Sequence, residues 1–256
     1  MQVTQMATSC SPQKRLGNNA MQELPKAILM DMDNTILAFD IAVMQTWGKV
    51  CRDFVSRVNG VTLSELLETV IERRDWFWSD PARNRWGRIH SVEAHRDIVR
   101  SALARLGIDS SDIANDMTDS LSVELDRIIS PFPDALETIV QAKNREIRLA
   151  LLTNGGTEAQ RRKINKFNLT DYFDCIVVEG EFGVGKPDER VFRHALEQLQ
   201  VAPADAWMVG DNLETDVAPA QKLGMTGIWV DWADKGLPKG NNVIPHRIIR
   251  GLPELL

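Results

Sequence analysis

The feature that most constrains the fold is an alternation of short apolar segments with segments of helical spacing after residue 131. The apolar segments are residues 147–152, 175–178, 206–209 and 227–230. The helical spacing falls at residues 134–143, 157–167 and 188–199, and again before residue 223. Strands that alternate with helices in this way form a parallel sheet with helices on both faces.

One more apolar run, residues 27–30, comes earlier and leads into Asp31 and Asp33. A short apolar run that ends in carboxylates is typical of a buried parallel strand whose carboxyl end meets solvent. It is followed by four segments of helical spacing without a convincing strand, with a connection rich in Trp and Arg at residues 75–90. The four segments are residues 41–58, 63–74, 92–106 and 112–128.

We therefore predict an α/β fold in which a doubly wound, Rossmann-like parallel sheet carries an inserted α-helical domain. The core is expected at residues 25–40 and 127–256, and the insertion at residues 41–126. Residues 1–24 are polar and lack periodicity, so we expect a disordered tail there.

Composition excludes several classes of protein. Hydrophobic residues make up 43% of the 256 residues and charged residues 26%, a balance typical of globular proteins. The net charge of −6 disfavours a general nucleic-acid surface, and no apolar run is long enough to cross a membrane. The start of the chain lacks the apolar centre of a signal peptide, and three scattered cysteines argue against a disulfide framework. We expect a cytoplasmic protein without nucleic-acid or membrane partners.

Polar residues follow the predicted strands at the point where each strand ends. Asp31 and Asp33 follow the first strand, Thr153 and Asn154 end the second, and Asp211 follows the strand at 206–209. In open parallel sheets, ligands bind outside the carboxyl ends of the strands. Lys186 follows the strand at 175–178 by a short loop, so we expect all these side chains at one edge of the sheet.

The acidic residues of this set suit a hard cation. Two close carboxylates repel each other unless a cation or a proton lies between them. Mg²⁺ takes oxygen ligands, usually including one or two carboxylates, and Asp31 with Asp211 would supply them. Thr35 is expected either to hold these carboxylates by a hydrogen bond or to cap a helix. Asp216 is expected either to orient a metal-bound water or to cap a helix.

The remaining residues suit an anion. Thr153 and Asn154, with Gly155 and Gly156, offer a hydroxyl and backbone N–H groups at a helix start. Lys186 would neutralise a phosphoryl group beside them. Together with the acidic pair, this set suits phosphoryl transfer through an aspartyl-phosphate. Neither a P-loop nor a Gly-x-Ser-x-Gly motif is present.

Four motifs follow one another along the chain, and their order resembles that of the four motifs of the haloacid dehalogenase-like (HAD) hydrolase superfamily. The motifs are DMDNT at 31–35, LLTN at 151–154, GKP at 185–187 and GDNLETD at 210–216. The resemblance covers roughly residues 25–256, and the insertion resembles the helical cap of the first cap class. Asn34 departs from the pattern because many relatives carry Gly there, but Asn also adopts tight turns.

The resemblance implies a role for each matching position. Asp31 would be the nucleophile, and Asp33 would be the general acid for the leaving oxygen and then the base for the attacking water. Mg²⁺ would be held by the side chains of Asp31 and Asp211 and by the backbone carbonyl of Asp33.

Three further positions complete the site that the resemblance implies. Thr153 and Asn154 would hold the phosphoryl oxygens, with Lys186 screening their charge. Asp216 would match the second acid of the fourth motif and act through water.

The whole chain looks most like the small-molecule phosphatases of the superfamily. We expect a Mg²⁺-dependent phosphoric monoester hydrolase that acts on a small phosphorylated metabolite, as a monomer or homodimer. A sugar-phosphate phosphomutase shares the same motifs and stays an alternative. A 2-haloacid dehalogenase is less favoured because that branch lacks an acid matching Asp33. A non-catalytic phosphate-binding module is also less favoured because the nucleophile, acid, lysine and metal ligands are all present.

The substrate would be selected by the insertion, because the core recognises only the phosphate. Residues 73–100 carry seven arginines against four acidic residues, with Trp76, Trp78 and Trp86 among them. One interpretation is a pocket for an anionic or ring-bearing phosphate ester, built by Arg83, Arg85, Arg88 and Trp86. The other is a packed helical core with solvated arginines. The sequence leaves both open.

Overall fold

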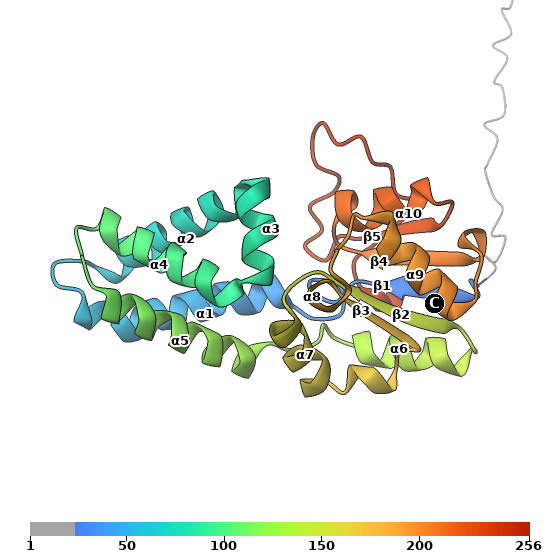
Figure 1. Ribbon diagram of the computed structural model, residues 1–256, viewed down its shortest axis with the longest axis horizontal. Coiled ribbons are helices and arrows are strands. Elements are labelled where there is room, and N and C mark those ends of the chain that lie inside the picture. Colours follow the sequence, from blue (N-terminus) through green and yellow to red (C-terminus); the bar gives the residue numbers. More distant parts are fainter. Residues whose placement is uncertain (1–23) are drawn as a thin grey trace, which may run out of the picture.

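The computed structural model describes residues 24–256. The tail expected at residues 1–24 falls almost wholly outside the described residues, so it stays a prediction. Figure 1 shows two parts side by side, a bundle of helices and a sheet with helices around it. Among the described residues, no helix is long and apolar enough to cross a bilayer.

The sheet has six parallel strands in the order β3-β2-β1-β4-β5-β6, which confirms the predicted α/β fold. The strands are β1 (Ala27–Met30), β2 (Arg148–Thr153), β3 (Cys175–Val178), β4 (Ala206–Gly210), β5 (Thr226–Val230) and β6 (Arg247–Ile249). Met30 of β1 pairs with Leu151 of β2 and with Val209 of β4. This register places Asp31, Thr153 and Asp211 at nearly the same level of the sheet, where the strand order reverses.

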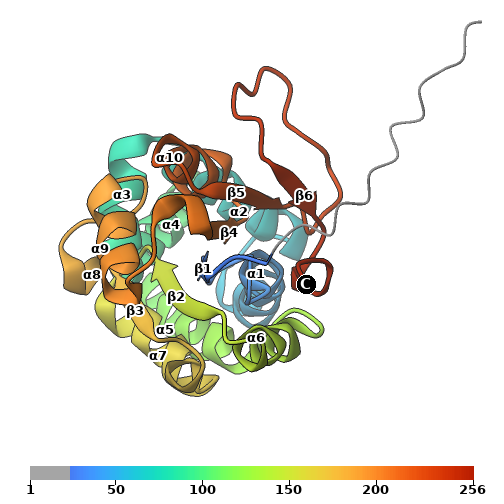
Figure 2. The ribbon, with the colours of Figure 1, turned by 90° about the vertical axis from the view of Figure 1, so that its right-hand side faces the viewer.

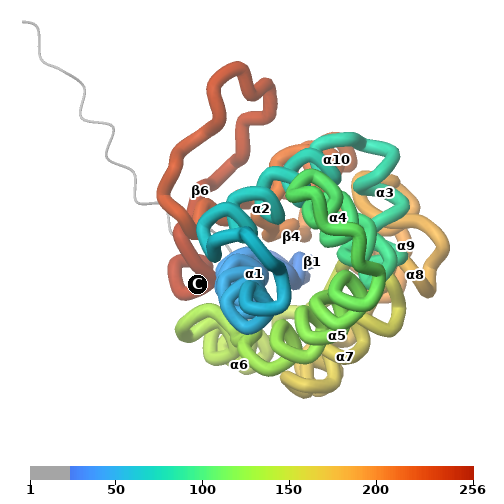
Figure 3. Tube along the Cα trace, turned by 90° about the vertical axis from the view of Figure 1, so that its left-hand side faces the viewer, coloured from blue at the N-terminus to red at the C-terminus, as the bar shows by residue number. Residues whose placement is uncertain are grey.

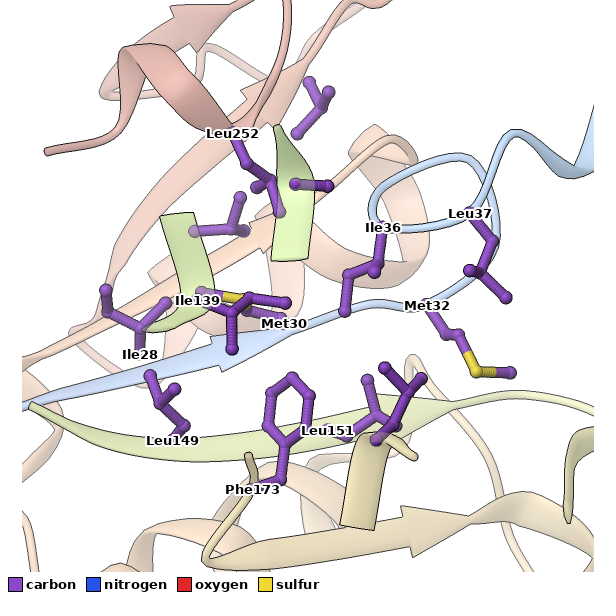
Figure 4. Close-up of a cluster of buried hydrophobic side chains, with 14 of the residues drawn as sticks. Ile28, Met30, Met32, Ile36, Leu37, Ile139, Leu149, Leu151, Phe173 and Leu252 are labelled. Carbon is purple, nitrogen blue, oxygen red and sulfur yellow. The ribbon is translucent and has the colours of Figure 1, made fainter. Parts of the chain in front are cut away.

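Helices cover both faces of the sheet because the side chains of β1 alternate between them (Figure 2). Ile28 and Met30 pack with Ile139 of α6 (Ala135–Asn144) and Ile164 of α7 (Thr157–Lys166). Figure 4 shows part of this cluster, in which Phe173 and Leu149 also meet.

The opposite face of the sheet has its own apolar layer. Leu29 packs there with Phe192 of α9 (Glu189–Leu199) and Ala220 of α10 (Ala218–Lys222). The short helix α8 (Glu179–Phe182) follows β3 directly, and a π-helical turn (Leu213–Val217) precedes α10.

Five α-helices follow β1 and lie together in a bundle (Figure 3). Their buried side chains form a separate apolar core. They are α1 (Phe39–Phe54), α2 (Leu63–Ser79), α3 (Pro81–Ile89), α4 (Ser91–Arg105) and α5 (Ser111–Ile128). We call this segment, α1 to α5, the cap. The fully buried side chains of Trp47, Leu66 and Met117 lie at its centre.

The prediction of a connection at residues 75–90 is wrong, because α2 runs to Ser79 and α3 begins at Pro81. Only Asp80 separates the two helices. Its carboxylate accepts hydrogen bonds from the backbone N–H groups of Ala82 and Arg83, while Pro81 takes the first helical position. An Asp N-cap followed by Pro is a strong signal for the start of a helix. The prediction relied on the Trp/Arg-rich composition of this segment and overlooked that signal.

Leu29→Ala is expected to lower the free energy of unfolding by about 2–5 kcal/mol, because it opens a cavity in a fully buried central strand. Urea denaturation of the full chain measures this loss. Val123→Ala on α5, where the side chain is 71% exposed, is the matched control and should stay within about 0.5 kcal/mol. Equal effects of the two substitutions would contradict the assigned core.

Candidate active site

A buried lysine lies at the centre of the site. The Nζ atom of Lys186 is 2.6 Å from Oδ1 of Asp31 and 2.7 Å from Oδ1 of Asp216. Asp31 follows β1, Lys186 lies in the loop between α8 and α9, and Asp216 lies in the π-helical turn after β4. The lysine is only 2% exposed, so its ammonium group depends on these two carboxylates in place of water.

Charge and burial shift the pKa values of this cluster. Burial raises the pKa of Asp31 to about 7, although the Lys186 ammonium opposes this shift. Burial also raises the pKa of Asp211 to about 9, and the negative charges of Asp31 and Asp216 add to the effect. Burial alone would lower the pKa of Lys186, but the carboxylates of Asp216 and Asp31 outweigh it and raise that pKa.

The acidic residues of the cluster fit a divalent cation. Asp31, Asp211 and Asp216 each offer a carboxylate oxygen, and these three oxygens lie within 4.8 Å of one another. If all three ionise, their negative charge exceeds the single positive charge of the Lys186 ammonium group. The indole N–H of Trp229 donates to the backbone carbonyl of Asp211 at 2.7 Å, which fixes this end of the cluster. Hard oxygen ligands with excess negative charge suit Mg²⁺.

Asp216 does not cap a helix, contrary to one of the two expectations. Asn212 is the cap, because its Oδ1 accepts from the backbone N–H groups of Glu214 and Thr215. Asp216 instead accepts from the backbone N–H of Asn212 at 3.1 Å and contacts Lys186. A Cβ atom at Gly210 would lie 2.3 Å from Oδ2 of Asp216, so the buried position of this acid requires glycine at the end of β4.

Asp33 lies in the tight turn that leaves β1. Asn34 adopts the left-handed conformation at a φ of 63°, as expected for a residue in place of Gly. Thr35 is buried, but its hydroxyl has no hydrogen-bond partner among the described residues. Neither contact expected of Thr35 is therefore seen, since α1 begins only at Phe39 and Ala38 is its N-cap residue.

Thr153 and Asn154 end β2 beside this turn. The side chain of Asn154 forms two hydrogen bonds of 2.8 Å with the backbone of Lys186, accepting from its N–H and donating to its carbonyl. Both polar atoms of Asn154 therefore hold the lysine loop. Contact of Thr153 and Asn154 with phosphoryl oxygens stays a prediction. The hydroxyl oxygen of Thr153 accepts a hydrogen bond from Gln160 at 2.6 Å.

A cavity of about 320 Å³ lies between the cap and the core. Asp33, Asn154 and Gly155 line it from the core side. The cap side is lined mainly by Phe39, Arg74, Trp78, Arg88, His95 and Leu121. Burial lowers the pKa of His95 to about 4, with a further contribution from Arg74, so this imidazole is neutral at physiological pH.

Only Arg88 of the four candidate specificity residues lines this cavity. Arg83 instead lies 3.8 Å above the ring of Trp76 and donates to backbone carbonyls at the end of α2. Arg85 is exposed, and Trp86 is 42% exposed and stacks on His90. The prediction of one pocket formed by Arg83, Arg85, Arg88 and Trp86 is therefore wrong, because α3 turns Arg83 onto Trp76 and leaves Arg85 and Trp86 exposed.

Arg88 joins the cap to the core. Its guanidinium group forms two hydrogen bonds, of 2.6 and 2.7 Å, with the buried carboxylate of Glu179 at the start of α8. Its backbone carbonyl accepts from Gly156 at 2.9 Å. A Cβ atom at Gly156 would lie 2.5 Å from the carbonyl oxygen of Ile89, so this close approach requires glycine. Glu179 also accepts from the backbone N–H of Gly155, the residue after Asn154.

Sequence analysis missed Gln160, Lys163 and Glu179. Gln160 and Lys163 both contact Asp33 from α7, and their spacing of three residues was a usable signal, because it places them on one face of the helix that follows Thr153. Glu179 gave no signal, because its partner Arg88 is 91 residues away in sequence.

Because Glu179 is buried, breaking its ion pair with Arg88 should lower the free energy of unfolding more than breaking an exposed ion pair would. A double-mutant cycle with Arg88→Met and Glu179→Gln, followed by urea denaturation, is expected to give a coupling energy of about 1–3 kcal/mol. The exposed Arg85→Met is the matched control and should show no coupling with Glu179→Gln. A coupling energy near zero for Arg88 would show that this contact does not hold the cap.

Two curated relatives are similar to part of the chain. A phosphoserine phosphatase of Thermus thermophilus is 44% identical over 100 residues, which are 39% of this chain and 40% of that protein. An N-acylneuraminate-9-phosphatase of Rattus norvegicus is 39% identical over 112 residues, which are 43% of this chain and 45% of that protein. The chain thus spans less than half the length of these relatives.

Solved structures are similar over nearly the whole described chain. The HAD-hydrolase YfnB from Bacillus subtilis, solved with magnesium bound, has a TM-score of 0.70 at 20% identity and covers 91% of this chain and 97% of its own. A 2-haloacid dehalogenase of Pseudomonas syringae pv. Tomato has a TM-score of 0.59 at 25% identity, covering 91% and 96%. At 20% identity, the similarity to YfnB supports the fold alone.

The family itself is shown by a family model. The model for haloacid dehalogenase-like hydrolases matches residues 25–224, which include all four motifs. The chain therefore belongs to the haloacid dehalogenase-like hydrolase family.

Proposed function

We propose that the protein is a Mg²⁺-dependent phosphatase that hydrolyses a small phosphorylated metabolite through an aspartyl-phosphate on Asp31. The observation that carries this proposal is the ion pair between Lys186 and Asp31, with a second carboxylate, Asp33, on the same turn. The buried ammonium group orients the Asp31 carboxylate and would offset the charge of an incoming phosphoryl group. Asp33 lines the cavity and is placed to exchange protons.

The first step transfers the phosphoryl group to the protein. A carboxylate oxygen of Asp31 forms a bond to phosphorus as the bond between phosphorus and the ester oxygen breaks. The leaving oxygen takes the proton of Asp33 and departs as an alcohol. The Thr153 hydroxyl holds a phosphoryl oxygen, because its own oxygen already accepts from Gln160 and its hydrogen is free to donate.

The second step restores the protein. Asp33, now ionised, takes a proton from a water molecule whose oxygen attacks phosphorus. The bond between phosphorus and Asp31 breaks, inorganic phosphate leaves, and Asp33 again holds a proton. Asn154 keeps Lys186 in place throughout, through its two hydrogen bonds with the lysine backbone. Mg²⁺, when held by Asp31 and Asp211 and by the backbone carbonyl of Asp33, neutralises phosphoryl charge.

The names of the similar proteins support a phosphatase. The Thermus and Rattus relatives are both named as phosphatases, and they differ in the rest of the substrate. Dehalogenases are among the similar folds, but Asp33 favours a phosphatase, since a carbon–halogen bond needs no acid to protonate its leaving halide. We assign the selection of the leaving group to the insertion expected at residues 41–126, with Arg88 as the retained candidate.

Asp31→Asn is expected to abolish phosphate release, because an amide cannot replace the carboxylate nucleophile. The purified protein is incubated with a panel of phosphorylated metabolites, with Mg²⁺ or with EDTA, and released phosphate is measured. Release that requires Mg²⁺ and is lost in Asp31→Asn is the expected result. Isomerised substrate without free phosphate would point to a mutase, and equal release by the variant would contradict the role of Asp31.

Mg²⁺ is expected to stabilise the protein, because binding relieves the repulsion among Asp31, Asp211 and Asp216. A ligand present at a hundred times its Kd adds about 2.7 kcal/mol to the free energy of unfolding. Thermal unfolding with increasing MgCl2, at constant ionic strength, measures this shift. Asp211→Asn should show a clearly smaller shift than wild type, and an unchanged shift would exclude Asp211 as a ligand.

A further inference from the structure

Two side chains of α7 that line the cavity contact Asp33. The Gln160 amide nitrogen donates to Oδ2 of Asp33 at 3.0 Å, and the Lys163 ammonium group pairs with the same oxygen. Gln160 and Lys163 are one helical turn apart and both are buried. The Lys163 ammonium also lies 4.5 Å from the ring centre of Phe39, where α1 begins.

The orientation of the Gln160 amide is fixed by its neighbours. Its nitrogen contacts Oδ2 of Asp33, the hydroxyl oxygen of Thr153 at 2.6 Å and the backbone carbonyl of Asn154 at 2.7 Å. A carboxylate and a carbonyl only accept hydrogen bonds, so the nitrogen of the amide must face them. Gln160 therefore connects Asp33 directly to Thr153.

The two oxygens of Asp33 have different surroundings. Oδ2 receives both contacts from α7, whereas Oδ1 is buried and accepts no hydrogen bond from any described residue. The contacts to Oδ2 restrict rotation of the carboxyl group. They therefore fix the orientation of this carboxyl group beside the cavity that Asp33 lines.

We propose that Gln160 and Lys163 are positioning residues that hold Oδ2 of Asp33 and so orient its carboxyl group for proton exchange with the leaving group and then with water. This inference rests on the proposed phosphatase function. It gives α7 a part in proton transfer, while Asp31 and Lys186 serve the phosphoryl group.

The inference predicts a dependence on the leaving group. Benzyl phosphate releases an alkoxide that must be protonated as it leaves, whereas p-nitrophenyl phosphate releases a stable anion that needs no proton. The value of kcat/KM reports only the steps up to the first phosphoryl transfer, so the later hydrolysis of the aspartyl-phosphate does not enter the comparison. Poor placement of Asp33 should therefore reduce kcat/KM for benzyl phosphate selectively.

Lys163→Met and Gln160→Met keep unbranched side chains of similar length, which limits the loss of packing. Each is expected to lower kcat/KM for benzyl phosphate about tenfold to a hundredfold, and that for p-nitrophenyl phosphate about threefold or less. Lys163→Arg should recover part of the loss, because it restores a cation beside Oδ2. Lys222→Met is the matched control. Lys222 lies on α10 in an exposed ion pair with Glu189 of α9, and its substitution should leave both kcat/KM values unchanged.

The ratio of the two kcat/KM values decides the test, because a partly folded preparation lowers both values equally. A changed ratio in the two α7 variants, with the control at the wild-type ratio, supports the inference. An unchanged ratio in an active wild-type background overturns the inference and leaves the phosphatase function intact. A wild-type protein that releases phosphate from neither ester, nor from any metabolite of the panel, overturns both.

Discussion

The site depends on one interaction, the contact of the buried Lys186 ammonium with Asp31 and Asp216. It draws together three segments that follow different strands. The positive charge of Lys186 offsets the repulsion among the close carboxylates of Asp31, Asp211 and Asp216. Removal of one partner of a buried ion pair costs about 3–5 kcal/mol, because the other charge is left without compensation. Asn154, which follows β2, fixes the backbone of Lys186. It thereby positions the ammonium group that balances the charge of Asp31 after β1.

The fold and the meeting of the motifs were predictable from the sequence, because parallel strands end at one edge of a sheet. Asp31, Thr153 and Asp211 each lie at the end of an apolar run, and the structure places them within one residue of the same level. Gln160 and Lys163 were not predicted, because their contact with Asp33 depends on how α7 is rotated against the turn after β1. Strand periodicity carries no information about that rotation.

The arginines of the cap show a second limit of sequence reasoning. Arg83, Arg85 and Arg88 lie within six residues, and composition gives no reason to separate them. Their surroundings differ because α3 turns each to another side: one stacks on Trp76, one is exposed, and one pairs with Glu179 of α8. The partner that decides each role comes from elsewhere in the chain.

The junction of Arg88 with Glu179 divides the cap into two regions with different freedom to change. The last turn of α3 contacts Gly156 and Glu179, and Glu179 in turn accepts from the backbone N–H of Gly155, next to Asn154, which holds the backbone of Lys186. Substitutions there would disturb the chemistry itself. The cavity walls formed by α2, α4 and α5 have no such link to the lysine loop among the described contacts. New substrate preferences can therefore arise on these helices during divergence while the reaction is preserved.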